Sequence, residues 1–69
     1  MDYFTTKSGD TILAMARLSG NRAAVLLIPS YIGWATALMD AENYCNHTEY
    51  FDTLAEARAS FQKRAYREA

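Results

Sequence analysis

Residues 11–28, TILAMARLSGNRAAVLLI, form two apolar runs on either side of the dipeptide Gly20-Asn21. Glycine and asparagine both tolerate a positive φ, and between apolar runs such a pair predicts a two-residue β-hairpin loop. That loop would place Ser19 opposite Arg22 and fix the register of two antiparallel strands. The competing interpretation is a helix over residues 12–19, because this stretch contains several good helix formers.

The pair Gly9-Asp10 repeats this turn composition upstream. A loop there would pair residues 1–7 with the next strand and place Thr5 opposite Ala14. The two turns together favour strands over a helix. We therefore predict a three-stranded antiparallel meander over the first 28 residues.

Both faces of this predicted sheet are apolar. Side chains alternate between the faces of a strand, so one face would carry Leu13, Met15 and Leu26, and the other Ile12 and Val25. A sheet with one wet face shows polar alternation instead. We therefore expect helices on one face and, on the other, either a partner or an exposed patch of the kind that marks interaction sites.

The period changes after Pro29-Ser30, where proline ends the strand and serine suits a helix N-cap. Four apolar residues spaced 4, 3 and 4 positions apart are typical of one helical stripe: Trp34, Leu38, Ala41 and Cys45. We expect an amphipathic helix over residues 31–46. The alternative is two short strands, 34–39 and 44–51, joined by a turn at 40–43.

A second helix is expected at the C-terminus. Thr53-Leu54-Ala55-Glu56 has the form of a capping box, in which Thr53 accepts from the Glu56 N–H and Glu56 reaches back. The helix would run from Leu54 to about Glu68. The predicted fold is one α+β domain over residues 1–69, with a three-stranded antiparallel meander followed by two helices. The alternative is a five-stranded meander with one C-terminal helix.

The bulk properties exclude several classes of protein. A chain of 69 residues has room for one domain, and its hydrophobic content of 51% argues against disorder. The net charge of −1 argues against a dedicated nucleic-acid binder, because phosphate neutralisation dominates such affinity. The longest apolar run, residues 23–28, is too short to span a membrane. A single cysteine and the absence of a signal peptide favour the cytoplasm.

No residue pattern indicates catalysis or a cofactor. Cys45 and His47 are two positions apart, which on a helix directs their side chains away from each other. One cysteine and one histidine also fall short of a zinc site. The glycines are isolated and lack the spacing of a phosphate-binding loop. We expect a protein that is not an enzyme and that holds no metal or cofactor.

Charge and aromatic residues indicate two candidate binding surfaces. Residues 40–56 contain acidic and aromatic side chains but no lysine or arginine, and tyrosine is enriched at protein interfaces. The candidate partner-binding residues are Asp40, Glu42, Tyr44, Glu49, Tyr50 and Asp52. The C-terminal stretch is basic instead, and its candidate anion contacts are Arg58, Lys63, Arg64 and Arg67.

The size, the sheet-then-helix layout, the acidic stretch and the lack of active-site residues resemble the small inhibitor proteins of phages and mobile elements, such as anti-CRISPR and anti-restriction proteins. The resemblance concerns layout and no motif. It implies a stoichiometric inhibitor of a larger protein or nucleoprotein assembly, in which acidic side chains occupy a site meant for nucleic acid. The alternatives are a nucleic-acid-binding module that uses the basic helix and a subunit that associates with itself through the sheet.

Overall fold

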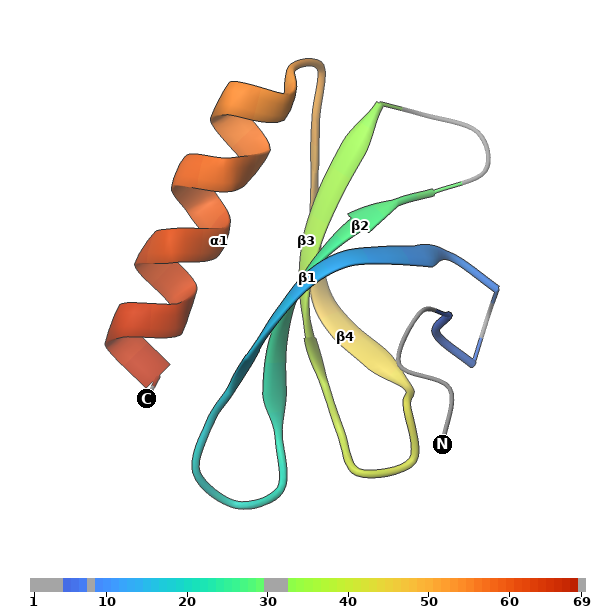
Figure 1. The fold of residues 1–69 in the computed structure, drawn as a ribbon, viewed down its shortest axis with the longest axis vertical. Helices are drawn as coiled ribbons and strands as arrows, with labels where there is room; N and C mark the ends of the chain where they lie inside the picture. Colours follow the sequence, from blue (N-terminus) through green and yellow to red (C-terminus); the bar gives the residue numbers. More distant parts are fainter. Residues whose placement is uncertain (1–4, 8, 30–32, 69) are drawn as a thin grey trace.

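The computed structural model describes residues 5–7, 9–29 and 33–68, with side chains as far as Tyr66. It shows a small, compact α+β domain in which a four-stranded antiparallel meander precedes one helix (Figure 1). The radius of gyration of 10.7 Å is close to the value of about 11 Å expected for a domain of this length. The elements are β1 (Thr11–Arg17), β2 (Ala23–Ile28), β3 (Trp34–Met39), β4 (Cys45–Phe51) and α1 (Leu54–Glu68).

The predicted hairpin joins β1 and β2, but its loop is one residue longer than expected. The Leu18 N–H donates to the Arg22 carbonyl at 2.9 Å, so the loop is Ser19-Gly20-Asn21. Gly20 and Asn21 both have positive φ, at 71° and 62°, as their turn chemistry predicts. The predicted register is therefore wrong by one position, because Met15 pairs with Val25 instead of Leu26. Such a shift exchanges the faces on which side chains lie.

A β-bulge in β1 redistributes the apolar residues further. The pairing shifts between Ile12 and Ala14, so that Ile12 lies opposite Leu27. The intervening Leu13 is 46% exposed. The expectation that Met15 shares a face with Leu26 is wrong, because Met15 pairs with Val25 and packs against the core cluster that contains Val25. A bulge adds a residue to one strand and changes its alternation.

The predicted first strand is not present in the described residues of the N-terminal segment. Thr5 forms an isolated bridge with Thr11, not with Ala14. The Lys7 N–H donates to the carbonyl of Asn43 at 2.8 Å, which ties this segment to the loop between β3 and β4. Residues 1–4 of the predicted strand lie outside the described residues.

The helix expected over residues 31–46 is wrong. Residues 34–39 and 45–51 form β3 and β4, within one residue of the alternative prediction, although the sheet has four strands and not five over the described residues. The apolar spacing of this stretch predicted a helix incorrectly because both faces of β3 are buried, with Ala35 and Thr36 each 0% exposed. An apolar run without polar alternation fits a helix and a buried strand equally well.

Helix α1 confirms the C-terminal prediction and its cap. The Glu56 N–H donates to the Thr53 hydroxyl oxygen at 3.2 Å, and that hydroxyl donates to Glu56 Oε1 at 2.9 Å. This reciprocal pair satisfies one of the amides that a helix N-terminus leaves without an intrahelical partner. On the inner side of the helix, Ala57 is 0% exposed and packs toward the sheet.

Both faces of the sheet are covered. Helix α1 packs on β2, β3 and β4, and on this face the hydroxyls of Thr36 and Ser60 lie 3.0 Å apart. The N-terminal segment lies on the opposite side of the sheet from α1 (Figure 1). Met15 and Cys45 pack, partly buried, against the core of the second face, so the open face that the sequence led us to expect is not found among the described residues. The residues of this core are only 0–7% exposed: Ile12, Ala23, Val25, Leu27, Ala35, Ala37 and Met39.

Candidate partner-binding surface

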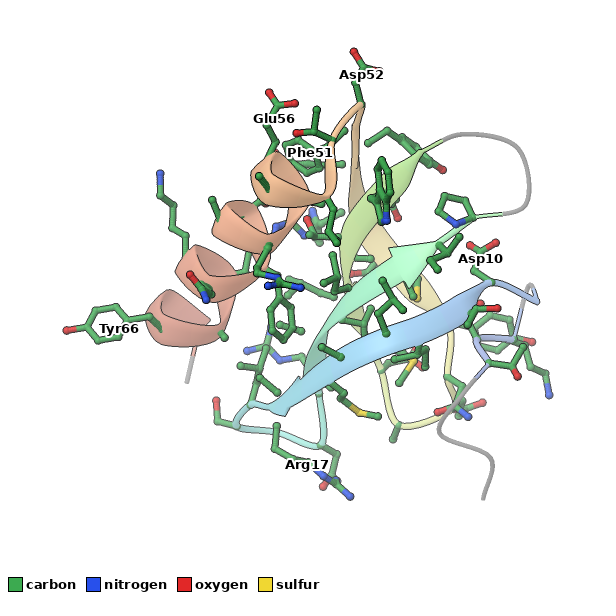
Figure 2. All side chains as sticks on the ribbon, turned by 45° about the horizontal axis from the view of Figure 1, so that its top comes forward. Asp10, Arg17, Phe51, Asp52, Glu56 and Tyr66 are labelled. Carbon is green, nitrogen blue, oxygen red and sulfur yellow. The ribbon has the colours of Figure 1, made fainter. Side chains whose placement is uncertain are left out.

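The predicted partner-binding residues lie near the two ends of β4. Asp40, Glu42 and Tyr44 belong to the β3–β4 loop, whereas Glu49, Tyr50 and Asp52 lie near the junction with α1. Figure 2 shows Asp52 at that junction, beside the first turn of the helix and Glu56. The acidic residues therefore do not form one continuous patch, and each group has its own local role.

Asp40 organises the β3–β4 loop. Its Oδ1 accepts from the backbone N–H of Glu42 at 2.9 Å and of Tyr44 at 3.1 Å, so that its side chain imitates a backbone turn. The next turn bond runs from the Asn43 N–H to the Asp40 carbonyl at 3.0 Å, and Asn43 has a φ of 69°. The Asp40 carboxylate is thus used within the loop, whereas Glu42 is exposed beside it.

Glu49 joins β4 to the helix. Its Oε1 lies 3.1 Å from Arg64 Nη2 and accepts from the Ser60 hydroxyl at 3.2 Å. Because the single Ser60 proton goes to Glu49, the buried Thr36 hydroxyl donates to Ser60. The network fixes α1 against β3 and β4, which gives Glu49 a structural role that its position in an acidic stretch did not predict.

A groove of about 730 Å³ lies between α1 and β4. Four side chains of the basic residue types line it, and they come from the end of the first hairpin, β4 and α1: Arg22, His47, Lys63 and Arg64. Glu49 and Ser60 lie among them. The structure therefore concentrates positive charge in a place that sequence order did not indicate.

His47 reaches this groove because of a second bulge. The pairing of β3 with β4 shifts between Thr36 and Leu38, and His47 opposite this shift has a φ of 52°. Positive φ is uncommon for a residue with a side chain, and bulges often redirect side chains next to functional sites. No feature of the sequence around His47 predicts this conformation.

The basic residues predicted as one cluster separate in the structure. Lys63 and Arg64 line the groove, whereas Arg58 lies on another part of α1, in a hollow with Leu54 and Gln62. The side chain of Arg67 lies outside the described residues. The sequence did not indicate Arg22 as a groove residue, because only the sheet register brings the end of the first hairpin beside the helix.

Strand β4 is the exposed edge of the sheet. All five residues from Asn46 to Tyr50 are exposed. Tyr44 and Tyr50 are 52% and 48% exposed, and a tyrosine combines an apolar ring with a polar hydroxyl. Tyr66, at 90% exposed, points from α1 into solvent, away from the sheet (Figure 2).

Cys45 is a core residue and does not pair with His47. Its side chain packs against the apolar cluster of the second face, whereas His47 lines the groove on the helix side. Burial, followed by the carboxylates of Asp10 and Asp40, raises the pKa of the Cys45 thiol from 9.0 to about 11. The thiol is therefore protonated near neutral pH and is a poor nucleophile.

This pKa predicts slow thiol chemistry. At about pH 8 the native thiolate population should be about 100-fold below that of the unfolded chain. A thiolate of higher pKa is more nucleophilic, which offsets about tenfold of this loss in reaction rate. We expect a disulfide reagent such as DTNB to react with native Cys45 at least about tenfold more slowly than in denaturant. The unfolded rate should level off as pH rises above about 9, whereas the native rate should keep rising; equal rates at every pH would contradict the buried position.

Over the residues that the structure describes, no group of three or more His, Cys, Asp or Glu side chains is placed to hold a metal ion. In the same part of the chain, α1 falls short of the length and apolar character that membrane crossing requires. Comparisons with protein-family models, with curated proteins and with solved structures found no match.

Proposed function

We propose that the chain is a non-enzymatic binding protein that acts as a stoichiometric inhibitor of a larger protein or nucleoprotein assembly, as the resemblance in layout implies. Its contact surface would be the β4 surface, which we define as the side chains of Tyr44, Asn46, Thr48 and Tyr50 with the outer edge of the strand. The observation that carries the proposal is the exposure of every residue from Asn46 to Tyr50 on an edge strand.

An exposed edge strand offers main-chain donors and acceptors to an extended segment of a partner. The other edge, β1, is interrupted by its bulge and bridged by Thr5 at Thr11. In β4 the bulge at His47 limits regular pairing to the part of the strand that follows it. We therefore propose that a partner strand pairs along residues 48–51, that Tyr50 contacts it within this segment, and that Tyr44 contacts it beyond the bulge.

The exposed carboxylates support a partner surface of positive charge. Glu42 and Asp52 are both exposed and lie beyond the two ends of β4. Opposite charges at the rim of an interface increase the rate of encounter more than the final affinity. A basic surface that normally binds nucleic acid has the required charge, and a cytoplasmic site of action is part of this proposal.

The alternative functions receive less support. A nucleic-acid-binding module needs cations that follow a phosphate backbone, but Arg58 and Lys63 line different hollows and Arg64 is paired with Glu49. Self-association through an open sheet face requires exposed apolar residues. Over the residues that the structure describes, the core of the second face is 0–7% exposed, and Met15 and Cys45 beside it are partly buried.

The test is capture of a partner from a nuclease-treated bacterial lysate with tyrosine variants. We expect wild type to retain one stoichiometric protein. The double variant Tyr44→Ser/Tyr50→Ser should retain at least about tenfold less of it, because a hot-spot tyrosine contributes about 2 kcal/mol, on the order of a thirtyfold effect. Tyr66→Ser is the matched control, since Tyr66 is 90% exposed on α1, and it should bind as wild type does. Retention by the double variant, or loss with the Tyr66 variant alone, would contradict the proposed surface.

A further inference from the structure

The groove between α1 and β4 has the chemistry of an anion site. Arg22, Lys63 and Arg64 bring three permanent positive charges to it, and Glu49 is the single carboxylate in its lining. This excess contrasts with the net charge of −1 for the chain. Like charges that gather in a concave surface repel one another, so an anion between them would relieve the repulsion.

Arg64 supplies an oriented donor in this groove. Its Nη2 is held 3.1 Å from Glu49 Oε1, and its side chain is only 18% exposed. The buried Nη1 makes no hydrogen bond within the described structure. A buried guanidinium N–H without an acceptor is costly, so a shift of the side chain that brings Nη1 to a ligand in the groove would be stabilising. The planar guanidinium also matches the oxygen geometry of phosphate.

The bulge of β4 gives independent support. His47 lies at a φ of 52° and its side chain lines the groove opposite Lys63 and Arg64 of the helix. A non-glycine residue held at positive φ costs free energy, and such residues cluster at ligand sites. A strand whose side chains alternate regularly between the two faces would not require a positive φ at His47.

We propose that this groove binds the phosphate group of a small phosphorylated molecule. Its volume of about 730 Å³ falls within the range of small-molecule sites. Leu38 and Phe51 line the same groove and offer apolar contacts for the rest of the ligand. The cations form one cluster instead of a line, and Arg58 faces a different hollow, which favours a single phosphate over a nucleic-acid backbone. This site goes beyond the proposed function, because its residues are distinct from those of the β4 surface.

The test is a titration of the ¹⁵N-labelled chain with inorganic phosphate and with phenyl phosphate, at constant ionic strength set with sodium chloride. We expect saturable shifts of the backbone amides of His47, Ser60 and Lys63, with phenyl phosphate the tighter ligand. Lys63→Ala should weaken binding roughly tenfold, because it removes one charge-assisted hydrogen bond. Glu49→Gln removes the negative charge that competes with phosphate for Arg64. Binding should therefore tighten several-fold, which is roughly the strength of one ion pair near a protein surface. The amide oxygen of the glutamine still accepts from Ser60.

Arg58→Ala is the matched control, because it removes one positive charge from the same helix outside the groove. It should leave phosphate affinity within about twofold of wild type, as expected for a screened charge. His47→Gly separates ligand binding from stability, since glycine accepts the positive φ. This variant should fold as stably as wild type and bind phosphate more weakly.

Three results would overturn the proposal. The first is the absence of saturable shifts with either phosphate. The second is an equal loss in the Lys63 and Arg58 variants, which would indicate only a diffuse charge effect. The third is binding of a single-stranded oligonucleotide through these residues without any response to phenyl phosphate, which would assign the groove to nucleic acid instead.

Discussion

Leu27→Ala should lower the free energy of unfolding by about 3 kcal/mol, which is the usual cost of truncating a buried leucine. Leu27 is 1% exposed and is the largest of the fully buried side chains. It belongs to the second face of the sheet, where it packs with Ile12, Val25 and Ala35. A domain of 69 residues has a stability on the order of 5 kcal/mol, so this one change should bring the protein near the limit of folding.

Urea denaturation followed by circular dichroism measures this loss. Leu13→Ala is the matched control, because it makes the same chemical change at a residue of the β1 bulge that is 46% exposed. It should cost less than about 1 kcal/mol, since surface substitutions rarely cost more. Similar losses for both variants would contradict the conclusion that Leu27 lies in a closed core and that Leu13 lies outside it.

Gly33→Ala should destabilise the protein by about 2 kcal/mol, within the usual range for inserting an atom into a packed region. A Cβ at this position would lie 2.5 Å from the backbone carbonyl oxygen of Phe51. Because that oxygen belongs to the backbone, no side-chain rotation can relieve the contact. The residue after Gly33 pairs with Phe51 in the sheet, so the strain would act on the junction of β3 and β4.

Gly20→Ala is the control for this prediction. Gly20 has a φ of 71° and no atom within 4 Å of its ideal Cβ position. Its substitution should therefore cost only the backbone strain of an alanine at positive φ, about 1 kcal/mol. If thermal denaturation shows the Gly33 variant to be as stable as wild type, the close approach of residue 33 to β4 is wrong.

The C-terminal helix and the first hairpin could be predicted from the sequence because local chemistry determines them. Thr53 and Glu56 satisfy each other at the helix N-terminus, and no distant contact is needed for that signature. Gly20 and Asn21 take positive φ as expected. The exact loop length could not be predicted, because the same two residues fit both a two-residue and a three-residue turn.

Strands β3 and β4 were only the alternative prediction, for a different physical reason. Helix α1 covers one face of β3 and the core of the second face covers the other. Both faces of the strand are therefore largely apolar, and its sequence does not alternate between polar and apolar residues. Gly33 weakens a helix, and its actual role in close backbone packing depends on Phe51, a residue remote in sequence. Only the tertiary arrangement distinguishes these alternatives.

The groove could not be predicted because it combines residues from distant elements. Arg22, His47 and Lys63 are separated by more than a dozen positions each, and two of them reach the groove through a loop and a bulge. Tyr44 and Tyr50, which the sequence indicated as candidate partner-binding residues, are about half exposed. The sequence did not reveal that Tyr44 immediately precedes an edge strand and that Tyr50 lies within it near its other end.

Hydrogen–deuterium exchange of the chain alone and with its captured partner tests the proposed function most directly. The proposal predicts that amides of β4, over residues 46–51, exchange more slowly in the complex, whereas those of β1 (Thr11–Arg17) are unchanged. Slower exchange confined to β1 or α1, with β4 unaffected, would contradict the assignment of the β4 surface as the site where the partner binds.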